Sequence, residues 1–358
     1  MNLRELGEFG LIGRLSTQLA RRGGVKLAIG DDAALLDALQ APLVTCDCLV
    51  EEIHFRRDWT SARDLGFKAV SVNVSDIAAM GGRPVAAFVS LALSTRDELA
   101  WVEELYTGLE EAAALYGLTI CGGDTARSPL ATVLSITLVG EAPLAFSEPR
   151  PITRSDAQVG NIVLVTGTLG DSAAGLALLQ NPDCTVPEAT RAYLLARHHK
   201  PVARLREVEA VQALALQAST VSSPAVSAPA VFADASRVLT AGMDLSDGLA
   251  GDAAHIARAS QISIEIETAK LPISPPCRAA ATALGVDVLD WALAGGEDYE
   301  LLWCAPAAKV DSVIAAVQAA TATPVTAIGR CVAAEEQPVK TLHPDGTVAI
   351  AVQGFQHF

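Results

Sequence analysis

Apolar runs and helical patterns alternate along the first part of the chain. The apolar runs predict strands at residues 42–45, 84–93, 118–121 and 130–139. Residues 62–80 and 97–116 repeat apolar positions every three or four residues and predict helices. Apolar residues cover most of the first of these helices, so we expect it to be largely buried. Strands that alternate with helices predict an α/β or α+β domain whose ligands bind at strand ends.

A second set of elements begins after the proline-rich stretch Pro149-Arg150-Pro151. We therefore expect an N-terminal domain over 1–148 and a C-terminal α/β domain over 149–358. Residues 217–235 are rich in Ser, Pro, Ala and Val and have no periodicity, which predicts a mobile insertion outside the chemistry.

Aspartates stand at five places where an apolar run meets glycine, serine or threonine. Asp76 falls within the predicted helix 62–80, and the others are expected at turns beside strands. The stretches are Gly30-Asp31-Asp32, Thr45-Cys46-Asp47, Asn73-Val74-Ser75-Asp76, Gly122-Gly123-Asp124-Thr125 and Asp244-Leu245-Ser246-Asp247-Gly248. Each aspartate alone is as well explained by a helix cap or an Asx turn. Two carboxylates about 5 Å apart, however, repel by roughly 3 kcal/mol at an effective dielectric near 20. Because Mg²⁺ takes carboxylate and phosphate oxygens, we predict one site for several divalent cations that hold a polyphosphate.

Composition narrows the function classes. The chain has 358 residues, 51% of them apolar, and a formal charge of −15, which indicates a folded protein and argues against nucleic-acid binding. No apolar run is long enough to cross a membrane and no signal peptide is apparent, so we expect a cytoplasmic protein that does not bind membranes. The seven cysteines are expected to be mostly reduced, buried thiols.

The common phosphate-binding and hydrolase motifs are missing. We find no G-x-x-x-x-G-K-[ST], G-x-G-x-x-G after a strand, H-E-x-x-H or G-x-S-x-G sequence. A nucleotide would therefore have to be held through metal ions and a few arginines.

A series of motifs spanning nearly the whole chain closely resembles the thiamine-monophosphate kinase family. They are the five aspartate stretches together with Gly7-Glu8-Phe9, Ile53-His54-Phe55, Ile77-Ala78-Ala79-Met80-Gly81, Thr166-Gly167-Thr168-Leu169-Gly170 and Gly295-Gly296-Glu297-Asp298-Tyr299-Glu300. The resemblance implies the two-domain aminoimidazole ribonucleotide synthetase-like fold, with the N-terminal domain pairing across a homodimer. It also implies transfer of the γ-phosphoryl group of ATP to thiamine phosphate, giving thiamine diphosphate.

The resemblance also assigns roles to residues. The implied magnesium ligands are Asp32, Thr45, Cys46, Asp47, Asp76, Asp124, Asp244 and Asp247. The implied ATP contacts are Tyr106, Gly123, Asp124, Arg154 and Ser246. His54, Glu297 and Phe355 would contact thiamine phosphate. We expect in-line transfer without a covalent intermediate and without an acid–base or nucleophilic side chain, because the attacking phosphate is already ionised.

One residue departs from the family pattern. Cys46 stands where the family usually has Thr or Ser, and a thiol is a poor magnesium ligand. Either its backbone carbonyl is the ligand, or this position contributes less than in relatives.

Three other functions stay open. A selenophosphate synthetase should have a reactive Cys or Sec in an N-terminal glycine-rich segment, but no cysteine precedes Cys46. A hydrogenase-maturation carbamoyl dehydratase should end in cysteine, whereas this chain ends in Phe358. A non-catalytic nucleotide- or cation-binding module is the third alternative.

Overall fold

The computed structural model describes residues 3–29, 33–94, 96–145, 148–221 and 238–350. The chain forms two compact units. Unit 1 comprises residues 1–78, 82–151 and 199–203, and unit 2 comprises 79–81, 152–198 and 204–358.

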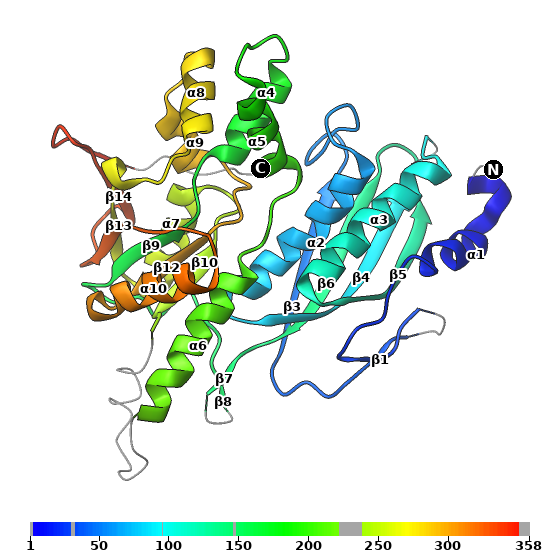
Figure 1. The fold of residues 1–358 in the computed structure, drawn as a ribbon, viewed down its shortest axis with the longest axis horizontal. Coiled ribbons are helices and arrows are strands. Elements are labelled where there is room, and N and C mark those ends of the chain that lie inside the picture. Colours follow the sequence, from blue (N-terminus) through cyan, green and yellow to red (C-terminus); the bar gives the residue numbers. More distant parts are fainter. Residues whose placement is uncertain (1–2, 30–32, 95, 146–147, 222–237, 351–358) are drawn as a thin grey trace. The chain divides into compact units, whose positions relative to one another are not determined.

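Unit 1 is built on a mixed sheet that has four strands in the described part of the chain, in the order β3-β6-β4-β5. These strands are β3 (Pro42–Val50), β6 (Val133–Glu141), β4 (Arg83–Leu93) and β5 (Thr119–Arg127). The pair β4 and β5 is parallel, and the other neighbours are antiparallel. Helices α2 (Ala62–Ala79) and α3 (Leu99–Tyr116) cover one face of this sheet (Figure 1). Buried side chains such as Leu105 and Ile136 fill the layer between them.

The sequence suggested that Asp47 and Asp124 lie at turns, but both lie inside strands. Asp47 lies inside β3 and Asp124 lies inside β5. Asp76 lies inside α2, as expected. Glycine and aspartate are unfavourable in isolated strands, but β5 is hydrogen-bonded along its length to β4, and this pairing outweighs the local preference.

Unit 2 contains a sheet with seven strands among its described residues, in the order β10-β12-β9-β13-β11-β14-β15. They are β10 (Ala241–Asp244), β12 (Leu301–Ala305), β9 (Ile162–Thr166), β13 (Val325–Val332), β11 (Ser263–Glu267), β14 (Val339–Leu342) and β15 (Val348–Ile350). The fully buried Trp303 and Leu164 lie in the central strands β12 and β9. The helices are α4 (Asp171–Gln180), α5 (Glu188–His199), α6 (Leu205–Val221), α7 (Leu249–Ser260), α8 (Pro275–Leu284), α9 (Val288–Ala294) and α10 (Val310–Ala320).

The remaining elements are short or peripheral. They are α1 (Leu3–Ser16), β1 (Val25–Leu27), β2 (Leu35–Leu36), β7 (Leu144–Ala145), β8 (Glu148–Pro149) and the single-turn helices η3 (Thr268–Lys270) and η4 (Ala307–Lys309). The predicted insertion over 217–235 was placed too early, because α6 continues to Val221. Its Ala-, Leu- and Gln-rich sequence favours helix through this point, and the rest of the insertion lies outside the described residues. No described helix is long and apolar enough to span a bilayer.

Candidate active site

In unit 1, residues of β3 and α2 form a compact acidic cluster. The hydroxyl group of Thr45 donates a hydrogen bond to the Asp76 carboxylate. The backbone N–H of Asp47 donates to Asn73 Oδ1 over 3.1 Å, and the Asn73 amide is held in turn by the Ala69 carbonyl. Asn73 and Asp76 are three residues apart and so lie on the same helix face. The structure thus brings three of the predicted magnesium ligands together: Thr45, Asp47 and Asp76.

The electrostatics of this cluster suit a cation. Burial and the negative charge of Asp76 raise the pKa of Asp47 from 3.8 to about 6. A divalent ion between the two carboxylates would remove both penalties, since it replaces lost hydration and offsets the repulsion.

Cys46 and Asp124 lie on the opposite face of the unit 1 sheet. Successive side chains alternate along a strand, so Cys46 is exposed on the face away from Thr45 and Asp47. The strand register aligns Asp124 with Ser90 of β4 and, through Ser135 of β6, with Cys48. This face carries exposed β3 side chains, and Asp124 is exposed as well. The sheet itself therefore separates Asp124 from Asp47 and Asp76.

Three further predicted contact residues belong to unit 1. Gly123 has a φ of 149°, and a Cβ there would lie 1.8 Å from the Val89 carbonyl oxygen, so this position requires glycine. His54 is half-buried in the turn after β3, where its Nδ1 accepts a hydrogen bond from the Val50 N–H over 3.1 Å. Tyr106 is buried on α3, and burial raises its pKa to about 12.

In unit 2, the turn between β10 and α7 presents two further predicted ligands, Asp244 and Asp247. Asp244 is the buried last residue of β10, and Ser246 and Asp247 follow in the half-buried turn. One carboxylate oxygen of Asp252, in the first turn of α7, accepts hydrogen bonds from the N–H groups of Asp247 and Gly248 over 3.2 and 3.1 Å. Asp252 therefore fixes the turn that carries Asp247.

The other oxygen of Asp252 is buried without a hydrogen-bond partner among the described residues. Burial, and then the carboxylates of Asp244 and Asp247, raise the pKa of Asp252 to about 8. A buried oxygen without a donor is costly, and neighbouring carboxylates add to that cost. The residues present therefore fit a cation at this turn, although no three His, Cys, Asp or Glu side chains in the described ranges form a ready-made metal site.

The loop over Gly295–Glu300 is hydrogen-bonded to the same turn. The N–H of Glu297 donates to the Ser246 carbonyl over 2.8 Å, and the N–H of Tyr299 donates to the Leu245 carbonyl over 2.9 Å. A Cβ on Gly296 would lie 2.5 Å from the Ser246 carbonyl oxygen, so this close approach requires glycine. The predicted substrate residue Glu297 thus lies beside the predicted nucleotide residue Ser246.

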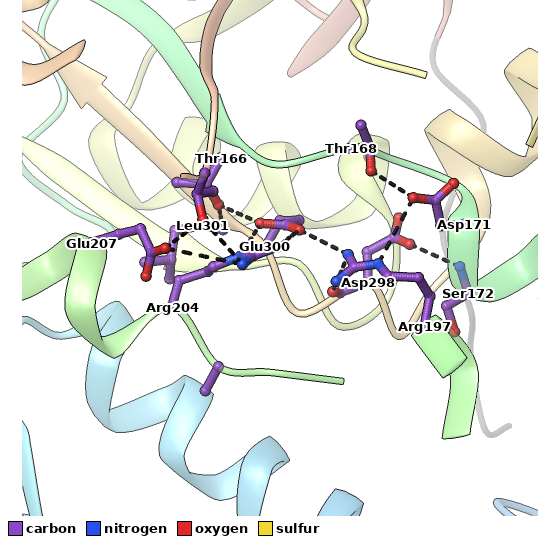
Figure 2. Close-up of polar contacts among 12 residues, drawn as sticks. Thr166, Thr168, Asp171, Ser172, Arg197, Arg204, Glu207, Asp298, Glu300 and Leu301 are labelled. Carbon is purple, nitrogen blue, oxygen red and sulfur yellow. Dashed lines mark hydrogen bonds and ion pairs between the residues drawn. The ribbon is translucent and has the colours of Figure 1, made fainter. Parts of the chain in front are cut away.

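Two acids that follow Glu297 belong to the internal support of unit 2 (Figure 2). Glu300 is fully buried and accepts hydrogen bonds from Thr166 and from Arg197 and Arg204, at 2.6 to 2.8 Å for three of these contacts. Burial acts to raise the pKa of Glu300, but Arg204 and Arg197 outweigh it and hold the pKa below its usual value. Asp298 accepts hydrogen bonds from two N–H groups at the start of α4, one of them that of Ser172.

The other predicted site residues are exposed or lie outside the described ranges. Arg154 is exposed near the start of unit 2. Asp32 and Phe355 lie outside the described residues.

Sequence reasoning missed three residues of these clusters. Asn73 could have been found from its spacing of three residues before Asp76 on a predicted helix. Asp252 lies four residues after Gly248, where a side chain in the first helical turn can accept hydrogen bonds from the turn before it. His198, which contacts Glu297, gave no such signal; it is buried near the end of α5.

The fold and the match to a family model define the class of this protein. Residues 30–142 match the model of the AIR synthase related protein, N-terminal domain, which confirms the expected fold class.

Comparisons with individual proteins narrow the class. The chain is 37% identical to the thiamine-monophosphate kinase of Aquifex aeolicus (strain VF5), over 86% of this chain and 88% of that protein. The structure of thiamine-monophosphate kinase from Stenotrophomonas maltophilia K279a is 33% identical, with a TM-score of 0.76 over 98% of this chain and 99% of that one. A solved structure of AaThiL complexed with AMPPCP and TMP is 34% identical, with a TM-score of 0.73 over 100% of this chain and 99% of that one. The chain belongs to the thiamine-monophosphate kinase family, which confirms both the resemblance and the prediction of an enzyme that transfers a phosphoryl group to a phosphate acceptor.

Proposed function

We propose that this chain uses ATP to phosphorylate thiamine phosphate, giving thiamine diphosphate and ADP by direct in-line transfer. Its family and the AaThiL complex with AMPPCP and TMP support the substrates. The observation that carries the proposal is the unsatisfied buried carboxyl group of Asp252 beside Asp244 and Asp247. A protein that bound no cation there would gain stability from a neutral side chain.

The proposed transfer needs no protein nucleophile. A phosphate oxygen of thiamine phosphate forms a bond to the γ-phosphorus of ATP, while the bond from that phosphorus to the β–γ bridging oxygen breaks and ADP leaves with the electron pair. The attacking oxygen is already ionised near neutral pH, so no base has to remove a proton. The residues of the chain then act by binding the two substrates and holding their reacting atoms in line.

We assign the cation ligands to Thr45, Asp47 and Asp76 in unit 1 and to Asp244 and Asp247 in unit 2, with Asp32, Cys46 and Asp124 retained from the family pattern. Bound Mg²⁺ would neutralise the phosphate charges so that the two anions can approach each other. We assign ATP contacts to Tyr106, Gly123, Asp124, Arg154 and Ser246. We assign thiamine phosphate contacts to His54, Glu297 and Phe355. Cys46 would contribute less than the other ligands, because its thiol lies beside Ser135 on the open sheet face.

We further propose a homodimer that pairs through the open face of the unit 1 sheet. Val44 on the edge strand β3 is 67% exposed, and Cys46 and Cys48 are exposed beside it. An exposed sheet face with apolar and small side chains is a favourable pairing surface. Because Asp124 lies on this same face, a second copy would bring further residues to it.

An assay of ADP formation tests the proposed reaction. We expect ADP to form only when thiamine phosphate, ATP and Mg²⁺ are all present, with thiamine diphosphate formed in equal amount. Unphosphorylated thiamine is the matched control and should give no ADP. Binding of ATP and Mg²⁺ without turnover would instead support the non-catalytic module.

A further inference from the structure

His198 links the predicted substrate residue Glu297 to the frame of unit 2. It is the penultimate residue of α5 and is only 6% exposed. Its Nδ1 atom lies 3.4 Å from Glu297 Oε2 and 3.0 Å from the hydroxyl oxygen of Ser172. Ser172 is in the first turn of α4, so the imidazole joins two helices to the glycine-rich loop.

The backbone holds Glu297 in an unfavourable conformation. Its φ is +65°, which is uncommon for a residue with a side chain. Its N–H is fixed to the Ser246 carbonyl, and Gly296 before it has no room for a Cβ. Such a conformation persists only where the surroundings impose it, and it occurs often at ligand sites. The loop therefore presents the Glu297 side chain in one direction.

The three acids of this loop have different surroundings. Glu300 is paired with Arg197 and Arg204, and Asp298 accepts hydrogen bonds from N–H groups at the start of α4. The side chains of both are almost completely buried, whereas that of Glu297 is 28% exposed. Of the three, Glu297 is thus the one that a ligand can reach, and His198 approaches its carboxylate.

From this geometry we infer that His198 is a positioning residue for thiamine phosphate binding, acting through Glu297. A carboxylate only accepts hydrogen bonds, so the arrangement is satisfied when Nδ1 of His198 carries the proton and donates it toward Glu297. The same Nδ1 lies 3.0 Å from the Ser172 hydroxyl oxygen, which can accept the same N–H as a second acceptor, so this contact restrains rotation of the imidazole. This inference rests on the proposed function, because it requires Glu297 to contact the acceptor substrate.

The test compares His198→Leu, which removes the donor, with His198→Asn, whose amide nitrogen can take the place of Nδ1. For His198→Leu we expect the KM for thiamine phosphate to rise about tenfold, as is typical when a residue behind a ligand contact is lost. The KM for ATP should change less than about twofold, within ordinary additive error. His198→Asn should recover most of the thiamine phosphate affinity. His199→Leu is the matched control: its Nδ1 contacts Thr60 in unit 1, so it should leave the KM for thiamine phosphate unchanged.

Glu297→Gln and the double variant separate the possible outcomes. If His198 acts through Glu297, adding His198→Leu to Glu297→Gln should weaken thiamine phosphate binding little further. Equal losses in the Leu and Asn variants, or additive losses in the double variant, would overturn the inference. If Glu297→Gln itself leaves thiamine phosphate binding unchanged while the wild type turns over, the assignment of Glu297 fails. If the wild type forms no thiamine diphosphate, the proposed function fails. Titration calorimetry with thiamine phosphate and AMPPCP, together with thermal unfolding, distinguishes lost positioning from lost folding.

Discussion

Unit 2 contains buried acids of two kinds. The strand that begins after Glu300 and the turn that Asp252 fixes are joined by the hydrogen bond from the Leu245 N–H to the Glu300 carbonyl. Around Glu300, two arginines and a threonine satisfy the carboxylate, and its pKa is held below the usual value. At the turn before α7, the carboxyl group of Asp252 faces Asp244 and Asp247, keeps one oxygen without a partner, and has its pKa raised to about 8. Burial is similar for both, so the difference lies in the sign of the neighbouring charges.

This difference distinguishes acids that stabilise the fold from acids that we assign to a cation site. A buried carboxylate with matched donors holds elements together and needs nothing from outside the chain. A buried carboxylate beside other carboxylates lowers stability unless a cation joins it, and such costs are typical of functional sites. Asp47 beside Asp76 in unit 1 belongs to the second kind.

The largest expected effect is on stability at Glu300. Glu300→Gln removes the charge that both arginines share, so we expect the free energy of unfolding to fall by about 3–5 kcal/mol. Glu265→Gln is the control, because its partner Arg330 is largely exposed and such pairs contribute about 0–1 kcal/mol. Chemical denaturation measures both variants. A loss at Glu300 no larger than the loss at Glu265 would contradict the supporting role of Glu300.

The next effect is on activity at Asp47. Asp47→Asn keeps the size of the side chain but removes a proposed cation ligand, so we expect kcat/KM to fall by about 100-fold, or about 2.7 kcal/mol of transition-state stabilisation. In EDTA its unfolding free energy should equal or exceed that of the wild type, since the repulsion from Asp76 is gone. Loss of activity together with a large loss of stability would place Asp47 with Glu300 instead.

A smaller effect concerns self-association. Val44→Asp places a charge on the open sheet face, and we expect the dissociation constant of the proposed dimer to rise at least tenfold, or about 1.4 kcal/mol. Leu130→Asp is the control, because Leu130 is also highly exposed but lies outside the strands of this face. Light scattering over a series of protein concentrations measures the average molar mass and hence the fraction of dimer. A protein that is monomeric before mutation would exclude the proposed pairing.

A further expected effect is on the pH dependence of stability. Burial raises the pKa of Asp298 from 3.8 to about 7, against the opposing hydrogen bond from the Gly170 N–H and the charge of Arg197. Between these two pKa values the folded state binds more protons than the unfolded state, so this group makes stability fall as pH rises from about 4 to about 7. Asp298→Asn should remove that part of the slope in denaturation measurements. An unchanged slope would show that its N–H donors keep Asp298 ionised, like Glu300.

The sequence predicted the family, the fold class and most of the helices, because these depend on long apolar patterns and on motifs that occur in order. It placed Asp47 and Asp124 wrongly at turns, since strand pairing with β6 and β4 outweighs the local turn preference of glycine and aspartate. The sequence also gave no reason to expect that Glu297 is accessible to a ligand while Glu300 is buried and paired. That distinction depends on Arg197 and Arg204, which are about a hundred positions away in the chain and adjacent only after folding.

The most direct test of the central claim is calorimetric titration of Mg²⁺ in the presence of AMPPCP into the wild type and into Asp47→Asn, Asp244→Asn and Glu265→Gln. We predict that Asp47→Asn and Asp244→Asn each weaken Mg²⁺ binding at least about tenfold, while Glu265→Gln binds like the wild type. Equal Mg²⁺ affinity in all four proteins would contradict the assignment of Asp47 and Asp244 to a cation site.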